Sequence, residues 1–321
     1  MPHAQSRDSS KNDTHAPKLF PPLNYQVPAH RICGLDAEGS SAPGSPGKYD
    51  NMLIRIGLTL LTLLSATAPP LGAQLQYPVD VAVDADGTVF VADHEAHALM
   101  KWDGNGFSVV AQGEGLPRTP LYGIRHIAPS GNGGFIASDP ATMKLYSIDA
   151  NGTIQALPDD DRFVTPWGIA VEPSGNILAV DRVTHRLRRV DVNGAVEDLL
   201  EIRAPRAVLF DADGNILVLT DDNLSRIDSA SSTPLANDPP FEFPHDAVLH
   251  PDGSFYVTDG YARAIWRVSA SGDVDSLVQG EPLISPQGLA VDSKGNLLVA
   301  DAHAKAIFQV TPEGEITRLG Q

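Results

Sequence analysis

The chain has 321 residues, enough for one large domain or two small ones. Its 40 acidic and 23 basic residues give a formal net charge of −17, which disfavours nucleic acid and anionic lipid as partners. The single cysteine, Cys33, precedes the part of the chain that has a folded pattern. A disulfide framework and a thiol-based site are therefore excluded from that part.

The first 73 residues have the composition of a leader. Residues 1–51 are rich in Ser, Pro, Ala and Asp without a hydrophobic period, which is typical of disorder or of a misassigned extension ahead of Met52. Residues 52–73 follow the order of a secretory signal peptide, with one basic residue, a short apolar run and small residues up to Ala73. We expect cleavage after Ala73 and a secreted or periplasmic protein without stable membrane insertion. An uncleaved anchor is the alternative, but a membrane span needs ~20 apolar residues.

From Pro78 onward one pattern recurs six times, roughly every 40 residues. Each copy has an apolar run, a Gly-bearing turn and a second apolar run that ends in Asp. A third run with a basic tip, a second Gly turn and a fourth run follow. In the first copy these four runs cover residues 81–83, 89–93, 99–101 and 107–111.

Continuous apolar runs are typical of strands that are buried on both faces, and Gly supplies the positive φ of tight hairpins. A four-stranded unit that repeats at this period is the blade of a β-propeller. We therefore predict an all-β fold over residues 74–321, a six-bladed propeller with four-stranded antiparallel blades. We also expect a monomer.

The third and sixth copies, residues 166–181 and 286–301, share the pieces Pro-x-Gly, Ala-Val, Gly-Asn and a final Asp. These pieces resemble the NHL repeat of secreted six-bladed propellers. The resemblance extends from Pro78 to about Leu319 and implies the propeller fold. It implies little about function, because this fold serves both enzymes and binding modules.

A residue that occurs in every copy has an architectural role, because a functional site has no use for six copies. We interpret the Asp that closes each second run as an acceptor for backbone N–H groups at the strand end. These six residues are Asp93, Asp139, Asp181, Asp221, Asp259 and Asp301.

The residue after the opening Pro differs in every copy, as Val79, Trp167, Arg206, His245 and Gln287 show, with Tyr122 near the equivalent place in the second copy. We expect these side chains to be exposed around one mouth of the central channel, beside residues such as His94 and Arg182. Arg125 and His126 replace residues such as Ala170 and Val171 of the third copy, and we expect them to point into the channel beneath the mouth. The candidate ligand-binding residues are Tyr122, Arg125, His126, Trp167, Arg206, His245, Asp246 and Gln287. An ordinary variable surface is the alternative.

The fifth copy, with its Pro244-His245-Asp246, is similar to one blade of the peptidyl-hydroxyglycine lyases. In those enzymes three blades each supply one His to zinc, and here His245 alone matches. His94, His126 or His303 would have to complete the set from other depths. We therefore expect no metal and no other cofactor, with His245 as the place for a divalent metal should one bind.

These features predict a binding module for a protein, peptide or saccharide at one channel mouth. The alternative is a lyase or lactonase-type enzyme with a polar, metal-containing site on the same face. Three or more His and carboxylate groups that converge in the channel would favour the enzyme. A ring of single, mixed residues would favour the binding module.

Overall fold

The computed structural model describes residues 73–158, 161–229 and 231–320. The predicted leader and nearly all of the predicted signal peptide lie outside these residues. Within the described ranges no helix occurs that is long and apolar enough to cross a membrane.

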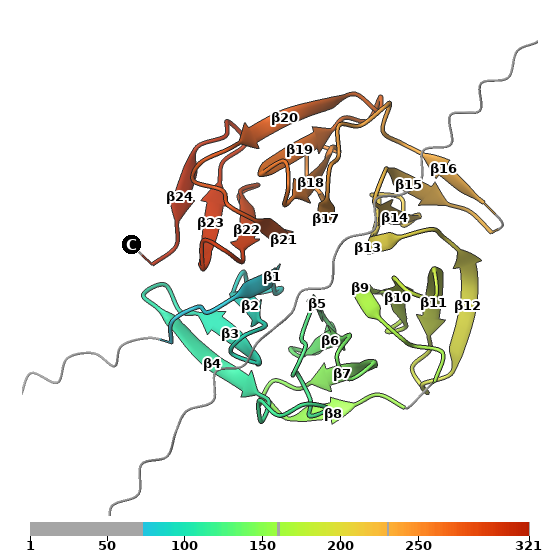
Figure 1. Cartoon of the computed structure of the whole chain (residues 1–321), viewed down its shortest axis with the longest axis vertical. Coiled ribbons are helices and arrows are strands. Elements are labelled where there is room, and N and C mark those ends of the chain that lie inside the picture. Colours follow the sequence, from blue (N-terminus) through green and yellow to red (C-terminus); the bar gives the residue numbers. More distant parts are fainter. Residues whose placement is uncertain (1–72, 159–160, 230, 321) are drawn as a thin grey trace, which may run out of the picture. The chain divides into compact units, whose positions relative to one another are not determined.

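The described residues form six antiparallel sheets of four strands each, arranged as a ring of blades, which confirms the predicted fold (Figure 1). The innermost strands are β1 (Pro78–Val83), β5 (His126–Pro129), β9 (Pro166–Val171), β13 (Pro205–Phe210), β17 (Pro244–Leu249) and β21 (Pro286–Val291). The second strands are β2 (Val89–Asp93), β6 (Phe135–Asp139), β10 (Ile177–Asp181), β14 (Ile216–Thr220), β18 (Phe255–Asp259) and β22 (Leu297–Asp301). The third strands are β3 (Ala98–Trp102), β7 (Lys144–Ile148), β11 (Arg186–Val190), β15 (Leu224–Ile227), β19 (Ala264–Val268) and β23 (Ala306–Val310). The outermost strands are β4 (Phe107–Gln112), β8 (Ile154–Ala156), β12 (Val196–Glu201), β16 (Ser232–Pro234), β20 (Val274–Gln279) and β24 (Ile316–Arg318).

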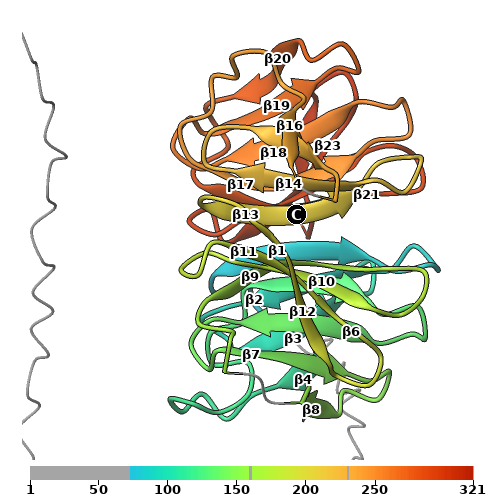
Figure 2. The same ribbon diagram turned by 90° about the vertical axis from the view of Figure 1, so that its right-hand side faces the viewer.

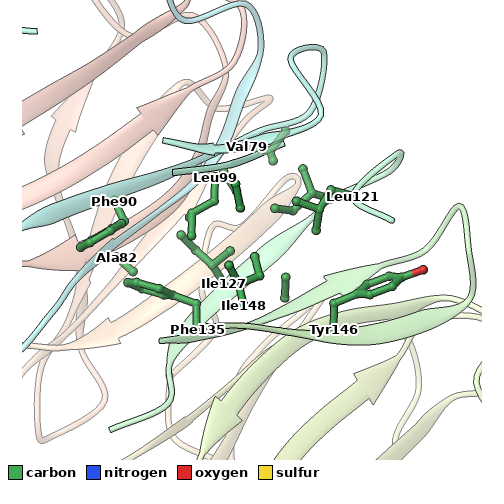
Figure 3. Packing of buried hydrophobic residues seen from close by; sticks show 13 residues of the cluster. Val79, Ala82, Phe90, Leu99, Leu121, Ile127, Phe135, Tyr146 and Ile148 are labelled. Carbon is green, nitrogen blue, oxygen red and sulfur yellow. The ribbon is translucent and has the colours of Figure 1, made fainter. Parts of the chain in front are cut away.

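Apolar side chains between neighbouring blades form the core. Between the first and second blades, Phe90 and Phe135 meet at 4.5 Å between ring centroids. Leu99 and Ile127 pack beside them in the same cluster (Figure 3). Figure 2 shows the blades from the side.

The ring closes between the first and sixth blades. Each sheet is built from one continuous segment, so no described strand crosses from one end of the chain into the blade of the other. Met100 and Phe107 of the first blade belong to one buried cluster with Leu298 and Ile307 of the sixth. Within the described residues, apolar packing between these two blades therefore closes the ring. The segment before β1 adds one bridge, from Ala73 N to Phe107 O at 2.7 Å.

The recurrent Asp residues accept backbone hydrogen bonds as expected in five blades. Asp181 is representative: its carboxylate accepts from the N–H groups of Val164, Thr165, Val183 and Thr184 at 2.7–3.1 Å. These bonds tie the loop before the inner strand to the end of the second strand.

The fourth blade departs from this rule, and the interpretation of Asp221 as a framework residue is wrong. Pro205 pairs with Thr220 in β13 and β14, whereas Pro244 pairs with Asp259 in the fifth blade. The fourth copy has one more residue between its Pro and its Asp, so Thr220 takes the framework place. The hydroxyl of Thr220 accepts the N–H of Asn223 at 3.1 Å. Asp221 is displaced toward the channel mouth, where it pairs with Arg206.

Candidate site at the channel mouth

In five blades the second residue of the inner strand stands where the strand enters the channel. In the first, fourth and fifth blades the pairing register shifts at this residue, because a β-bulge separates Pro78 from Asp80, Pro205 from Ala207 and Pro244 from Asp246. Bulges re-aim side chains and are frequent next to functional sites. The fold therefore presents a different side chain from each blade at one level of the channel.

The register corrects the placement of the second copy. His126 pairs with Ser138, the residue before Asp139, just as Asp80 pairs with Ala92 before Asp93. Arg125 therefore occupies the ring position of its blade, and it is not equivalent to Ala170. Tyr122 lies outside the ring: its ring stacks on His97 with 5.0 Å between centroids. The extra residues of this irregular copy concealed the register.

One pocket of about 310 Å³ opens at this level, within the size range of small-ligand sites. Five of the candidate residues line it together. They are Arg125, Trp167, Arg206, His245 and Gln287.

Tyr77, His94, Arg182 and Phe243 also line this pocket. The candidate set omitted Tyr77 and Phe243, although the sequence carries a signal for them. Both are aromatic residues directly before the opening Pro of a copy, where other copies have Thr165, Ala204 or Ser285.

Three guanidinium groups stand against the aromatic walls. The guanidinium carbons of Arg125 and Arg182 lie 4.3 and 4.7 Å from the Trp167 ring centroid. That of Arg206 lies 4.0 Å from the Phe243 centroid. Stacking of this kind fixes the planes of the cations while their N–H groups stay free to donate. Arg206 has an exposed fraction of only 1%, so the expectation that it lies exposed at the surface is wrong.

Several donors in this pocket are not satisfied within the described residues. Nη1 of Arg206 and Nε1 of Trp167 are buried and have no hydrogen-bond partner there. The guanidinium of Arg182 also forms no hydrogen bond or ion pair with the described residues. It contacts the Trp167 ring. Burial, and then the nearby charge of Arg206, lower the pKa of Arg182. Buried donors without acceptors cost free energy, which an acceptor on a ligand would recover.

His245 is neutral in this setting. Burial, followed by the charges of Arg125, Arg206 and Arg182, holds the pKa of His245 well below its ordinary 6.5. Its Nδ1 lies 3.0 Å from Nη2 of Arg125, and since a guanidinium can only donate, Nδ1 accepts. The proton of the neutral ring is therefore on Nε2, and the Nδ1 lone pair is already engaged.

His126 and Asp246 lie one level deeper and line a second hollow, of about 560 Å³, that opens among the inner strands. Nδ1 of His126 is 3.6 Å from Asp80, and Nε2 is 3.6 Å from Asp246. Burial disfavours the imidazolium, but the charges of Asp80 and Asp246 outweigh it and raise the pKa of His126 to about 9. Burial raises the pKa of Asp80 to about 7, although His126 opposes it. The sequence reasoning left Asp80 out, because the bulge that places it level with Asp246 was not foreseen.

Residues 75–102 match the family model of the NHL repeat. This segment is an NHL repeat. The matched segment covers β1, β2 and β3, the inner part of the first blade, and the other five NHL-like blades repeat its strand order.

Solved structures with the same architecture include enzymes and a binding protein. Virginiamycin B lyase from Staphylococcus aureus is 18% identical, with a TM-score of 0.58 over 77% of this chain and 86% of its own. A gluconolactonase from Xanthomonas campestris is 12% identical, with a TM-score of 0.63 over 76% and 87%. An auxiliary nutrient binding protein from Bacteroides thetaiotaomicron is 13% identical, with a TM-score of 0.60 over 77% and 70%. No curated protein matches the sequence. Likeness at these identities concerns the fold.

Proposed function

We propose that this NHL propeller is an exported binding module whose channel-mouth pocket takes a small ligand with a carboxylate head and an apolar body. The observation that carries the proposal is a set of donors that border one pocket and have no acceptor in the part of the chain that the structure describes: Arg182, Arg206 Nη1 and Trp167 Nε1. A carboxylate is acceptor-only and matches a guanidinium with two parallel hydrogen bonds. The rings of Tyr77 and Phe243 offer apolar contact beside that head.

The local charge supports an anion. The chain as a whole is strongly acidic, yet the pocket gathers three arginines, and Asp221 pairs with one of them. Burial lowers the pKa of Arg125 only to about 10, so this group stays charged at neutral pH. The field of the pocket therefore opposes that of the rest of the surface and would concentrate anions at the mouth.

The lyase or lactonase-type enzyme is the second candidate. The convergence of Asp80, His126 and Asp246 within 4.8 Å favours it, because three such groups are what a metal-assisted enzyme needs. These groups line the deeper hollow, whereas the predicted enzyme used the mouth face. His245 is not placed as a general base, because its lone pair accepts from Arg125. The binding module therefore remains the first proposal.

Calorimetric titration with carboxylates that carry an aromatic or aliphatic body tests this function. Arg182→Met should weaken binding at least tenfold. Arg189→Met is the matched control, because Arg189 pairs with Glu172 and Glu197. Binding should also weaken as salt rises. Equal affinity for the amide analogue of the ligand, or an unchanged affinity of Arg182→Met, would contradict the proposal.

Export rests on the pattern of residues 52–73 and is tested separately. Protein recovered from outside the cytoplasm should begin at or near Gln74 by N-terminal sequencing. Recovery with residues 1–51 attached would overturn it.

A further inference from the structure

The residue that follows each channel-mouth position forms a second ring, one level deeper in the channel. The pairing register makes Asp80, His126, Ala207 and Asp246 equivalent. Gly168 and Gly288 take the same place by sequence, two residues after the opening Pro of their copies. Three of these six residues carry groups that bind metals, Asp80, His126 and Asp246. The other three are Gly168, Ala207 and Gly288. Three of the six positions thus supply donor atoms, and the other three have almost no side chain.

The donor atoms converge from three separate blades. The imidazole lies between the two carboxylates, at 3.6 Å from each, and one donor atom from each residue lies within 4.8 Å of the others. The side chains of Asp80 and Asp246 are only 2% and 8% exposed. Nδ1 of His126 is buried and has no hydrogen-bond partner among the described residues. Two ligands of a tetrahedral zinc ion stand about 3.4 Å apart, so side-chain movements of about 1 Å close the set.

Backbone groups hold both carboxylates in place. Asp80 accepts from Val81 N at 2.8 Å and from Ile127 N, in the next blade, at 2.7 Å. Asp246 accepts from Ala247 N at 2.8 Å and from Leu289 N, again in the next blade, at 2.9 Å. Each oxygen keeps a second lone pair. Hydrogen bonds of this kind orient metal ligands, as outer-shell partners do in metal sites.

We propose that Asp80, His126 and Asp246 bind one divalent transition-metal ion, with Zn²⁺ the best fit. One imidazole nitrogen and one oxygen from each carboxylate are the protein ligands. An imidazole among the ligands favours zinc over Ca²⁺ or Mg²⁺, which prefer all-oxygen sets. Water from the deeper hollow, which all three of these residues line, completes the coordination. The site is distinct from the mouth pocket and does not depend on the proposed carboxylate ligand.

Titration of the EDTA-dialysed full chain with Zn²⁺, followed by calorimetry and elemental analysis, tests the site. We expect one bound ion per chain, weaker binding of Ca²⁺, and at least a hundredfold loss of Zn²⁺ affinity in Asp246→Asn and His126→Ala. Asp252→Asn is the matched control, because Asp252 lies in a surface turn with His250 and Arg267 and should bind as the parent does. The melting temperature without metal shows whether each variant folds.

A measurement on the parent protein does not depend on the variants. Zinc should shift the ¹⁵N resonances of the His126 ring in the chain, and Co²⁺ should give the visible absorption of a mixed nitrogen and oxygen site. Absence of binding at 1 mM free Zn²⁺ would overturn the proposal. The cluster would then be an ion pair of the His126 imidazolium with the carboxylates of Asp80 and Asp246. Binding that leaves the His126 resonances unmoved would also overturn it.

Discussion

The guanidinium carbon of Arg125 lies 4.3 Å from the centroid of the Trp167 ring. The same guanidinium donates to Gln287 Oε1 and to His245 Nδ1, and it lies close enough to Asp80 and Asp246 for their charges to act on it. One side chain from the second blade therefore connects the third, fifth and sixth blades across the channel.

This position predicts a large effect on stability. Arg125→Met should lower the free energy of unfolding by about 3–6 kcal/mol, because it removes two hydrogen bonds of a charged donor that are worth about 1.5–3 kcal/mol each. Arg182→Met should cost less than about 1 kcal/mol, because Arg182 is half-buried and contacts the same Trp167 ring without an ion pair among the described residues. Urea unfolding at pH 7 measures both. Equal losses would show that Arg125 is not a cross-channel support.

The framework aspartates should respond unequally to replacement by Asn. Burial tends to raise the pKa of Asp181, but the N–H groups of Thr184, Val164 and Thr165 outweigh it and lower that pKa. This carboxylate thus adds stability above pH 3.8, which is lost as the pH falls. Asp181→Asn turns an amide N–H₂ toward these donors and should cost roughly 1–3 kcal/mol at pH 7.

Asp139 behaves in the opposite way. Its Oδ2 is buried without a hydrogen-bond partner among the described residues, and burial raises its pKa above 3.8. A raised pKa in the folded state means that ionisation costs stability as the pH rises past 3.8. Asp139→Asn should therefore be neutral or stabilising at pH 7. A loss as large as that of Asp181→Asn in the same urea series would refute this distinction.

Arg206 and Asp221 should depend on each other. Arg206 is buried and pairs with Asp221, whose side chain is 49% exposed. Asp221→Asn should destabilise by about 1–3 kcal/mol, because it leaves a buried charge without its partner. In Arg206→Met the further change Asp221→Asn should cost almost nothing. A double-mutant cycle by thermal unfolding measures the coupling, and additive losses would contradict the pairing.

The contact between the first and sixth blades, which closes the ring, should be as strong as the contacts between other neighbouring blades. Ile307 in β23 and Ile265 in β19 are both fully buried at equivalent places, the first against the first blade and the second between the fifth and sixth blades. Either residue replaced by Ala should cost about 2–5 kcal/mol. A much smaller loss at Ile307, or faster amide exchange confined to the first and sixth blades, would show that the ring is weak where it closes.

The fold could be predicted because its determinants are local and repeated. Residues 81–83 and 89–93 show an apolar run, a Gly turn and an Asp, and six copies make such a pattern unmistakable. The structure extends the first run to Pro78–Val83 and confirms the second as Val89–Asp93.

The site could be predicted only in part, because its geometry depends on register. The residues after the opening Pro were recognised by their variation, and all five of them line the pocket with Arg125. The pairing register of two strands cannot be read from the sequence where a copy contains extra residues. For this reason Tyr122 and Asp221 were assigned to the wrong places. Asp80 and His126 lie at the same depth in the channel because of how their strands pair with the neighbouring strands. This pairing cannot be read from the residues of one copy alone.

Each blade is one contiguous stretch of chain, and this has a consequence for the order in which the blades are joined. Ala73 and Gly320 line the same surface hollow, of about 520 Å³, beside Trp102 and Lys305. A short peptide could therefore join these two ends, and the chain could be opened instead in the surface loop between β4 and β5. Such a circular permutant would keep every strand pair inside a blade. The ring thus has no obligatory first blade, and its order around the channel is a property of the contacts between neighbours.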